Sequence, residues 1–157
     1  MRVDGWIIKS PAVSVHNLES LASEVRAEYF PDAERIPVVW GKNTGRKRRR
    51  SIRLGSYHRG ATLIRIHPLL NSPSVPVYFI QSIIYHEFLH HVLGPAHDRR
   101  FHRHERCFRY HRESKEWLAH NLPMLLGLRA KPKHVDRRRL RAKTGDKPAV
   151  QMSLFGE

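Results

Sequence analysis

Hydrophobic residues recur with a helical period along much of the chain. In residues 18–29, apolar side chains return every three or four positions, and Asn17 is the expected N-cap. Residues 75–93 form the densest apolar run, as a buried helix requires. We expect Ser74 to cap the start of this second helix, and Gly94, followed by proline, to end it.

Two further helical segments follow. In residues 98–110, Phe101 and Glu105 are four positions apart and therefore share a face, which leaves the many His and Arg residues for the opposite face. Residues 117–126 are rich in leucine and predict a closing helical segment over the core. We expect Pro123 to break or restart this last helix, because proline removes a backbone donor.

Short strands are predicted between the first two helices. Residues 36–41 are β-rich, and residues 51–57 and 62–67 alternate apolar with polar side chains. Residues 58–60 between the last two read as a hairpin loop, so these strands should form a small antiparallel sheet in front of helix 75–93. The fold class we expect is α+β. An edge strand of this sheet could hold an extended peptide by strand addition.

The character of the chain changes at Arg129. Residues 129–157 are basic, poor in apolar side chains and without a period, which is typical of a disordered tail. We therefore divide the 157 residues into one folded domain, residues 1–128, and a basic tail. The single cysteine, Cys107, excludes an intramolecular disulfide and fits a reducing compartment.

Candidate chemistry lies on helix 75–93, in the H-E-x-x-H array that runs from His86 to His90. Residues four apart on a helix are about 40° apart around its axis, so both histidines can reach one metal ion. Glu87 lies beside the pair, where a carboxylate can act as general base on a metal-bound water. His97 follows just beyond the helix end and is the expected third ligand. Three protein ligands with an open fourth position are typical of a catalytic zinc site.

Other residues compete for the role of third ligand: His102, His104 and the acidic Glu105. Glu105 has a second interpretation, in which it orients a metal-bound histidine by a hydrogen bond. A plain structural interpretation also exists, namely a buried helix whose histidines are hydrogen-bonded in the core. That arrangement would leave Glu87 buried with no metal nearby, which is energetically costly.

The charge balance points to an anionic partner. The formal net charge is +15, which favours nucleic acid, although an anionic membrane surface would also attract the chain. We expect non-specific phosphate contacts from two basic segments. The candidate DNA-binding residues are Lys42, Arg46, Lys47, Arg48, Arg49 and Arg50 in the first segment and Arg137, Arg138, Arg139 and Arg141 in the tail.

The first residues have neither a long apolar core nor a small-residue cleavage site, so we expect no signal peptide. No stretch is long enough and free enough of charge to suggest a membrane span. We therefore expect a cytoplasmic, nucleoid-associated protein with no membrane partner.

The last residues place large apolar side chains at the end of the polar tail, where a pocket on a partner is their natural site. The segment Gln151-Met152-Ser153-Leu154-Phe155 resembles the bacterial sliding-clamp-binding motif. This resemblance implies that Leu154 and Phe155 enter an apolar cleft on the clamp and that the Gln151 amide binds at its rim. Methionine stands where leucine is commoner, but it fills apolar pockets well.

Several motifs together resemble the SprT-like zinc metalloproteases, in particular short bacterial members. They are residues 53–57 (RLGSY), 63–68 (LIRIHP), 85–91 (YHEFLHH) and the spacing from His97 to Phe101 and Glu105. The resemblance covers residues 36–122 and implies a zincin-like fold, one Zn²⁺ on His86, His90 and His97, Glu87 as the base, and protein substrates. The chain lacks the C-x-x-C pairs of an accessory zinc ribbon.

Together, protease motif, positive charge and clamp motif predict an enzyme that digests proteins stuck on DNA, in DNA–protein crosslink repair, delivered by the replication clamp. Eukaryotic relatives in the family perform this repair. The alternative is a non-catalytic adaptor that binds DNA and the clamp and has a structural metal site. A metal-dependent nuclease fits less well, because phosphoryl-transfer sites favour carboxylate-rich Mg²⁺ coordination and this site is rich in imidazole.

Overall fold

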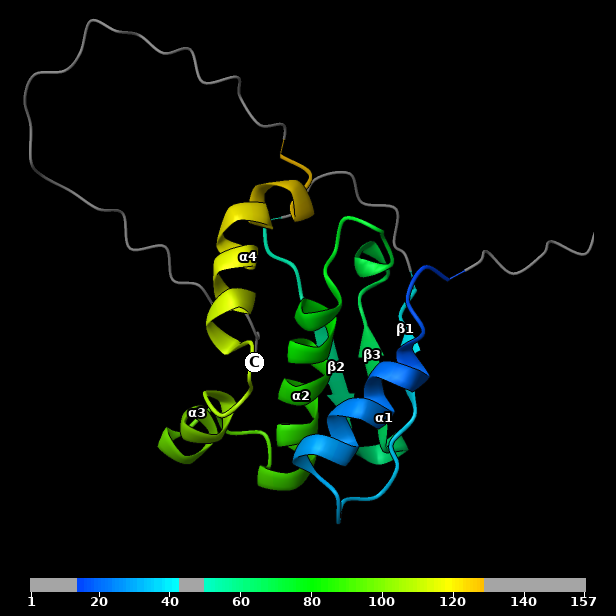
Figure 1. Ribbon diagram of the computed structural model, residues 1–157, viewed down its shortest axis with the longest axis vertical. Helices are drawn as coiled ribbons and strands as arrows, with labels where there is room; N and C mark the ends of the chain where they lie inside the picture. The colour runs from blue at the N-terminus through cyan, green and yellow to red at the C-terminus, as the bar shows by residue number, and fades with distance from the viewer. Residues whose placement is uncertain (1–13, 43–49, 129–157) are drawn as a thin grey trace, which may run out of the picture.

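The structure is a computed structural model that describes residues 14–42 and 50–128 (Figure 1). Within those residues it is α+β, as expected, with four α-helices and a three-stranded sheet. The elements in chain order are α1 (Leu18–Tyr29), β1 (Val38–Trp40), β2 (Gly55–His58), the 3-10 helix η1 (Arg59–Ala61), β3 (Leu63–Ile66), the 3-10 helix η2 (Pro68–Leu70), α2 (Val77–Leu93), α3 (Arg99–Glu105) and α4 (His111–Leu125).

The sheet is mixed, which corrects the expectation of a purely antiparallel sheet. The strand order is β1-β3-β2, with β2 antiparallel to β3 and β1 parallel to β3. Strand β2, the next strand after β1 in the sequence, lies at the other edge of the sheet. The chain then returns through η1 to β3 in the centre, which runs parallel to β1. The strands are also shorter than predicted, and residues 51–54 lie outside the β2 ladder.

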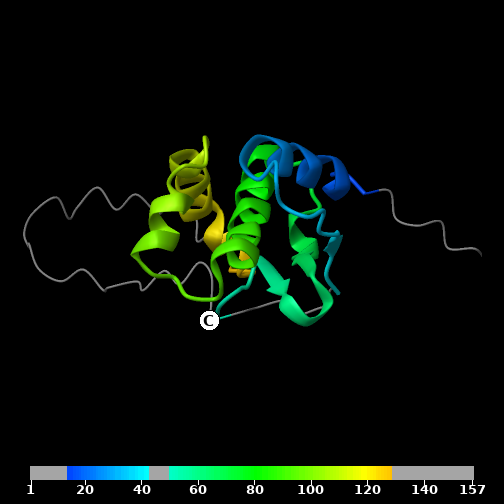
Figure 2. The same cartoon turned by 90° about the horizontal axis from the view of Figure 1, so that it is seen from below.

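Helix α2 lies at the centre of the domain, in contact with α1, α3, α4 and two strands (Figure 2). Its sequence is apolar almost all round, and its middle is buried in an unbroken run from Ile83 to Leu89. That run includes two polar side chains, His86 and Glu87, which are 1% and 3% exposed. Burying such groups is costly unless they have partners, so their surroundings determine what the domain can do.

The helix ends agree in part with the sequence. Asn17 caps α1 by accepting a hydrogen bond from the Ser20 N–H at 3.1 Å, as predicted. The expected cap at Ser74 is wrong, because its hydroxyl is hydrogen-bonded to the Ser72 hydroxyl and Pro76 occupies the N-cap position. Gly94 ends α2 with a φ of 98°, a conformation that favours glycine.

Pro123 does not break the last helix. Helix α4 continues through it to Leu125, so the expected break or restart is wrong. Because the proline lies close to the C-terminal end, the helix loses one hydrogen bond there and still closes its last turn, where the Leu126 N–H donates to the Leu122 carbonyl at 2.9 Å.

Candidate metal centre

Three histidines converge beside the C-terminal half of α2. The Nε2 atom of His86 lies 3.1 Å from Nε2 of His90 and 3.2 Å from Nε2 of His97. Among the described residues, these three form a cluster whose ligand atoms all lie within 4.8 Å of one another, close enough to bind one metal ion. The sequence pattern had selected the same three residues.

The turn after α2 brings His97 to the other two. Gly94 ends the helix, and Asp98 starts α3 by accepting a hydrogen bond from the Phe101 N–H at 2.8 Å. These two caps fix the short connection that carries His97. The rival ligands lie elsewhere: His102 and His104 are exposed on α3 and do not belong to the cluster.

Hydrogen bonds at the Nδ1 atoms set the protonation of the cluster. Nδ1 of His90 lies 3.0 Å from the Gly94 carbonyl, which can only accept, so this nitrogen carries the proton. Nδ1 of His86 lies 2.9 Å from Oε1 of Glu105, which is the contact that an orienting role of Glu105 requires. In a neutral imidazole the remaining nitrogen, Nε2, then presents a lone pair.

Burial favours the neutral form of His86, and hydrogen bonds and nearby positive charge favour the ionised form of Glu105. Burial lowers the pKa of His86 to about 4, against the opposing hydrogen bond and charge of Glu105. Burial alone would raise the pKa of Glu105, but hydrogen bonds and charge interactions with its histidine partners lower that pKa to about 2. A carboxylate acceptor therefore faces a neutral ring that donates from Nδ1.

The donor set fits a cation. The Nε2 lone pairs of His86 and His90 face each other at 3.1 Å, and two lone pairs at that distance repel unless a positive charge lies between them. Tetrahedral zinc with bonds of about 2.0–2.1 Å places two nitrogen ligands about 3.3–3.4 Å apart, close to the distances seen here. Three imidazoles also suit other divalent transition metals, so the donor set defines a metal site more firmly than it defines the metal.

Phe101 forms the apolar wall of the centre. Its ring is fully buried, and its centroid lies 4.8 Å from that of His86 and 4.7 Å from those of His90 and His97. One side chain therefore fixes three imidazoles and excludes water from their shared side. Sequence reasoning placed Phe101 on the same helix face as Glu105 but missed its contact with the three imidazoles. The spacing of four residues between Phe101 and Glu105 was the signal that could have indicated this contact.

Glu87 is a residue of α2, and its side chain packs against strand β2. Its carboxylate accepts a hydrogen bond from the Tyr57 N–H. The close approach depends on Gly55, where an added Cβ would lie 2.5 Å from Cγ2 of Ile83 and 2.7 Å from Oε1 of Glu87. Burial raises the pKa of Glu87 to about 7, against the opposing Tyr57 hydrogen bond and Arg53 charge. A carboxyl group with a pKa near 7 can both accept and return a proton at neutral pH.

A hydrogen bond that sequence reasoning missed joins β2 to α2. The Tyr57 hydroxyl lies 2.8 Å from Nδ1 of His91, and the two rings meet edge to face. Tyr57 therefore contacts α2 twice, through its backbone at Glu87 and through its side chain one turn later. The alternation along β2, which sends Gly55 and Tyr57 to the same side, was the signal for this contact.

The predicted DNA and clamp contacts fall largely outside the described residues. Lys42 and Arg50 are described and exposed. The other predicted DNA-binding residues, Arg46, Lys47, Arg48, Arg49, Arg137, Arg138, Arg139 and Arg141, lie outside the described residues, as do the clamp-motif residues Gln151, Met152, Ser153, Leu154 and Phe155.

Comparison with known proteins adds no assignment. No protein-family model, curated protein sequence or solved structure matches the chain. In the part of the chain that the structure describes, no helix combines the length and apolar character needed to cross a membrane.

Proposed function

We propose that the chain is a zinc-dependent metallopeptidase of the H-E-x-x-H type, with a zincin-like fold, that acts on proteins associated with DNA. One observation carries the proposal. The helix that supplies two of three clustered imidazoles also buries a carboxyl group, that of Glu87, which directly follows His86 in the sequence and has a pKa near 7. A purely structural metal site has no use for such a group.

The residues would divide the work as follows. His86, His90 and His97 hold the ion, with Glu105 fixing the ring of His86. When bound, the ion supplies Lewis acidity, which acidifies water and polarises a carbonyl group. Glu87 takes a proton from the attacking water and returns it to the leaving amine.

Substrate placement is supported by the sheet. Strand β2 is an edge of the order β1-β3-β2, and Glu87 binds the backbone of that same strand. An extended peptide that pairs with a sheet edge gains backbone hydrogen bonds whatever its sequence. Such a peptide on β2 would lie beside the general base, which suits an enzyme that digests unrelated proteins.

The DNA and clamp partners are supported by charge and motif. The net charge of +15 favours a polyanion, and residues 151–155 read QMSLF, which resembles a sliding-clamp-binding motif. We propose that the enzyme is brought to DNA by the clamp and removes crosslinked proteins there. Clamp binding that is unchanged after Leu154→Ala plus Phe155→Ala would contradict the recruitment part alone.

The decisive experiment measures cleavage of a DNA-bound protein by the zinc-loaded full chain, with and without DNA. We expect DNA-stimulated cleavage by the wild type, and a loss of at least about 100-fold in Glu87→Gln, since general bases contribute about 10²–10⁴. Glu116→Gln, an exposed position on α4, is the matched control. Metal content is measured for each protein, so that loss of the ion is separated from loss of the base.

Two outcomes would contradict the proposal. Strong cleavage by Glu87→Gln would remove the mechanism. An absence of cleavage by every variant, with the metal bound and DNA and clamp binding intact, would favour the other class considered above, a non-catalytic adaptor with a structural metal site.

A further inference from the structure

Helix α3 has two unlike faces. Its inner face carries Phe101, which packs on the three imidazoles, and Glu105, which holds His86. Its outer face carries Arg99, Arg103 and, at the end of the helix, Arg106, all of them exposed. The spacing i, i+4, i+7 places these three guanidinium groups in one stripe, on the side of the helix opposite Phe101.

The exposed arginines of α3 stand apart from the acidic side chains of residues 14–42 and 50–128. Among the described residues, no ion pair involves Arg99, Arg103 or Arg106, nor the neighbouring Arg100. Arg109, a little further along the chain, shows the contrast, because it binds Glu28 at 2.9 Å. The acid on α3 itself, Glu105, is turned inward to His86 and His102.

The helix dipole has opposite effects on the two ends of the stripe. Arg99 begins the first turn of α3, next to the capping Asp98, at the end that disfavours cations, whereas Arg103 and Arg106 lie at the C-terminal end, which favours them. A surface that served only solubility would mix both signs of charge. The stripe has no counter-charge among the described residues, and it suits an external polyanion.

We propose that the outer face of α3 is the docking surface for the phosphate backbone of duplex DNA. Guanidinium groups bind phosphate oxygens in a bidentate manner and stay charged at any physiological pH. Arg99 to Arg106 spans about 10 Å of helix axis, which matches about three base-pair steps of a duplex. The inference rests on the proposed function only for the choice of DNA among polyanions.

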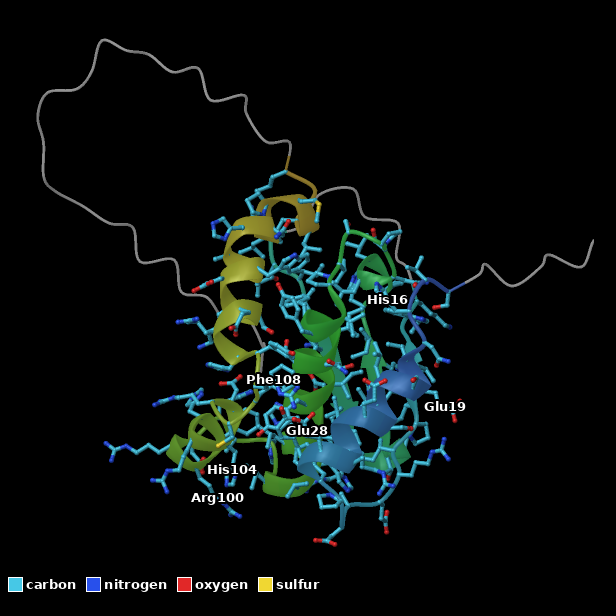
Figure 3. All side chains as sticks on the ribbon, in the orientation of Figure 1. His16, Glu19, Glu28, Arg100, His104 and Phe108 are labelled. Atoms are coloured by element: carbon cyan, nitrogen blue, oxygen red, sulfur yellow. The ribbon has the colours of Figure 1, made fainter. Side chains whose placement is uncertain are left out.

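This docking would set the direction of the metal centre. Figure 3 labels Arg100 and His104 on α3, at the margin of the molecule away from the sheet. With DNA on the outer face, the three histidines would lie on the other side of a single helix, about 10–12 Å in diameter. A protein attached to the duplex would then be close to the metal centre, while the duplex itself would be kept out of it.

The test compares two double variants of the full chain that remove the same charge. Arg99→Gln plus Arg103→Gln changes α3, and Arg59→Gln plus Arg65→Gln changes exposed positions at the sheet. Fluorescence anisotropy with a labelled duplex gives the affinity over a series of salt concentrations. We expect the affinity for duplex DNA in 0.1 M salt to fall about tenfold or more in the α3 variant and to stay unchanged in the sheet variant. In the α3 variant the magnitude of the slope of log K against log salt should also fall by about 2.

Other results would overturn the inference: duplex affinity unchanged in the α3 variant, an equal loss in both variants, or loss of binding to phosphatidylglycerol vesicles with none for DNA. Metal content and helicity, measured on both variants, show that the fold is kept. Anisotropy needs no peptidase activity. Duplex binding through α3 without any cleavage would therefore contradict the proposed peptidase activity but would still support α3 as the DNA-binding surface.

Discussion

Glu105 on α3 accepts a hydrogen bond from His86 on α2, with 2.9 Å between Oε1 and Nδ1. The contact orients a buried ring and keeps its proton on the nitrogen that faces away from the cluster. Outer contacts of this kind change metal affinity by about 10–100-fold. We predict that Glu105→Gln weakens metal binding by roughly tenfold, because a neutral amide oxygen is a poorer acceptor.

Competition with a coloured chelator measures this affinity. Glu116→Gln, at an exposed position on α4, removes a carboxylate that lies outside the cluster and should leave the affinity unchanged. Equal affinities for wild type and Glu105→Gln would show that the ring of His86 needs no orientation.

The identity of the third ligand gives a second prediction. His97→Ala should lose the bound ion under conditions in which wild type keeps one ion per chain, because only two imidazoles remain. His104→Ala is the matched control, since that side chain is exposed on α3 and lies outside the cluster. Elemental analysis after dialysis against a weak chelator measures the metal content. Retention of the ion by His97→Ala together with loss in His104→Ala would reverse the assignment.

Gly55 gives a third prediction, for stability. In Gly55→Ala the new methyl group would meet Ile83 at 2.5 Å and the Glu87 carboxylate at 2.7 Å, so β2 must move away from α2. Overpacking of this kind costs about 1–3 kcal/mol in the free energy of unfolding. Gly60→Ala, where nothing lies within 4 Å of the new atom, should change it by less than about 1 kcal/mol.

Denaturant unfolding of both alanine variants, with the metal concentration fixed, makes this comparison. Equal stabilities would mean that β2 does not lie as close to α2 as the structure places it. We also expect peptidase activity to fall in Gly55→Ala, because the substitution displaces the carboxylate.

The two N-caps give a fourth prediction. Asp98 caps α3 and Asn17 caps α1, each by one side-chain hydrogen bond to the first turn. Substitution of either by alanine should cost about 1 kcal/mol of stability. Asp98→Ala should also weaken metal binding, because α3 carries Phe101 and Glu105 to the cluster, whereas Asn17→Ala should not. Thermal unfolding and chelator competition separate the two effects, and identical metal affinities would argue against a role for α3.

The sequence predicted those parts of the site that depend on local spacing. His86 and His90 are one helical turn apart, and Gly94 stops the helix three residues before His97, so their meeting follows from short-range geometry. The sequence also offers Glu105 as a residue that orients a metal-bound histidine, as one of two alternatives, but it does not indicate that this histidine is His86.

Contacts between distant segments were not predictable in this way. The parallel pairing of β1 with β3 joins Val38 to Ile64, and nothing in either segment encodes the direction of the connection. The contact between Tyr57 and His91 likewise depends on how the sheet lies on α2. The raised pKa of Glu87 follows from burial, which is a property of the packed structure.

Two of the three histidines belong to α2 and the third to the turn that leads into α3, so an ion held there would cross-link the helix to that turn. Every chain that unfolds must release its ion, and stability then follows the free metal concentration. At about 100 times the dissociation constant the gain is about 2.7 kcal/mol, and each further tenfold adds about 1.4 kcal/mol. A chain deprived of its ion would become less durable as well as inactive, so metal supply would govern how much of this protein a cell can keep.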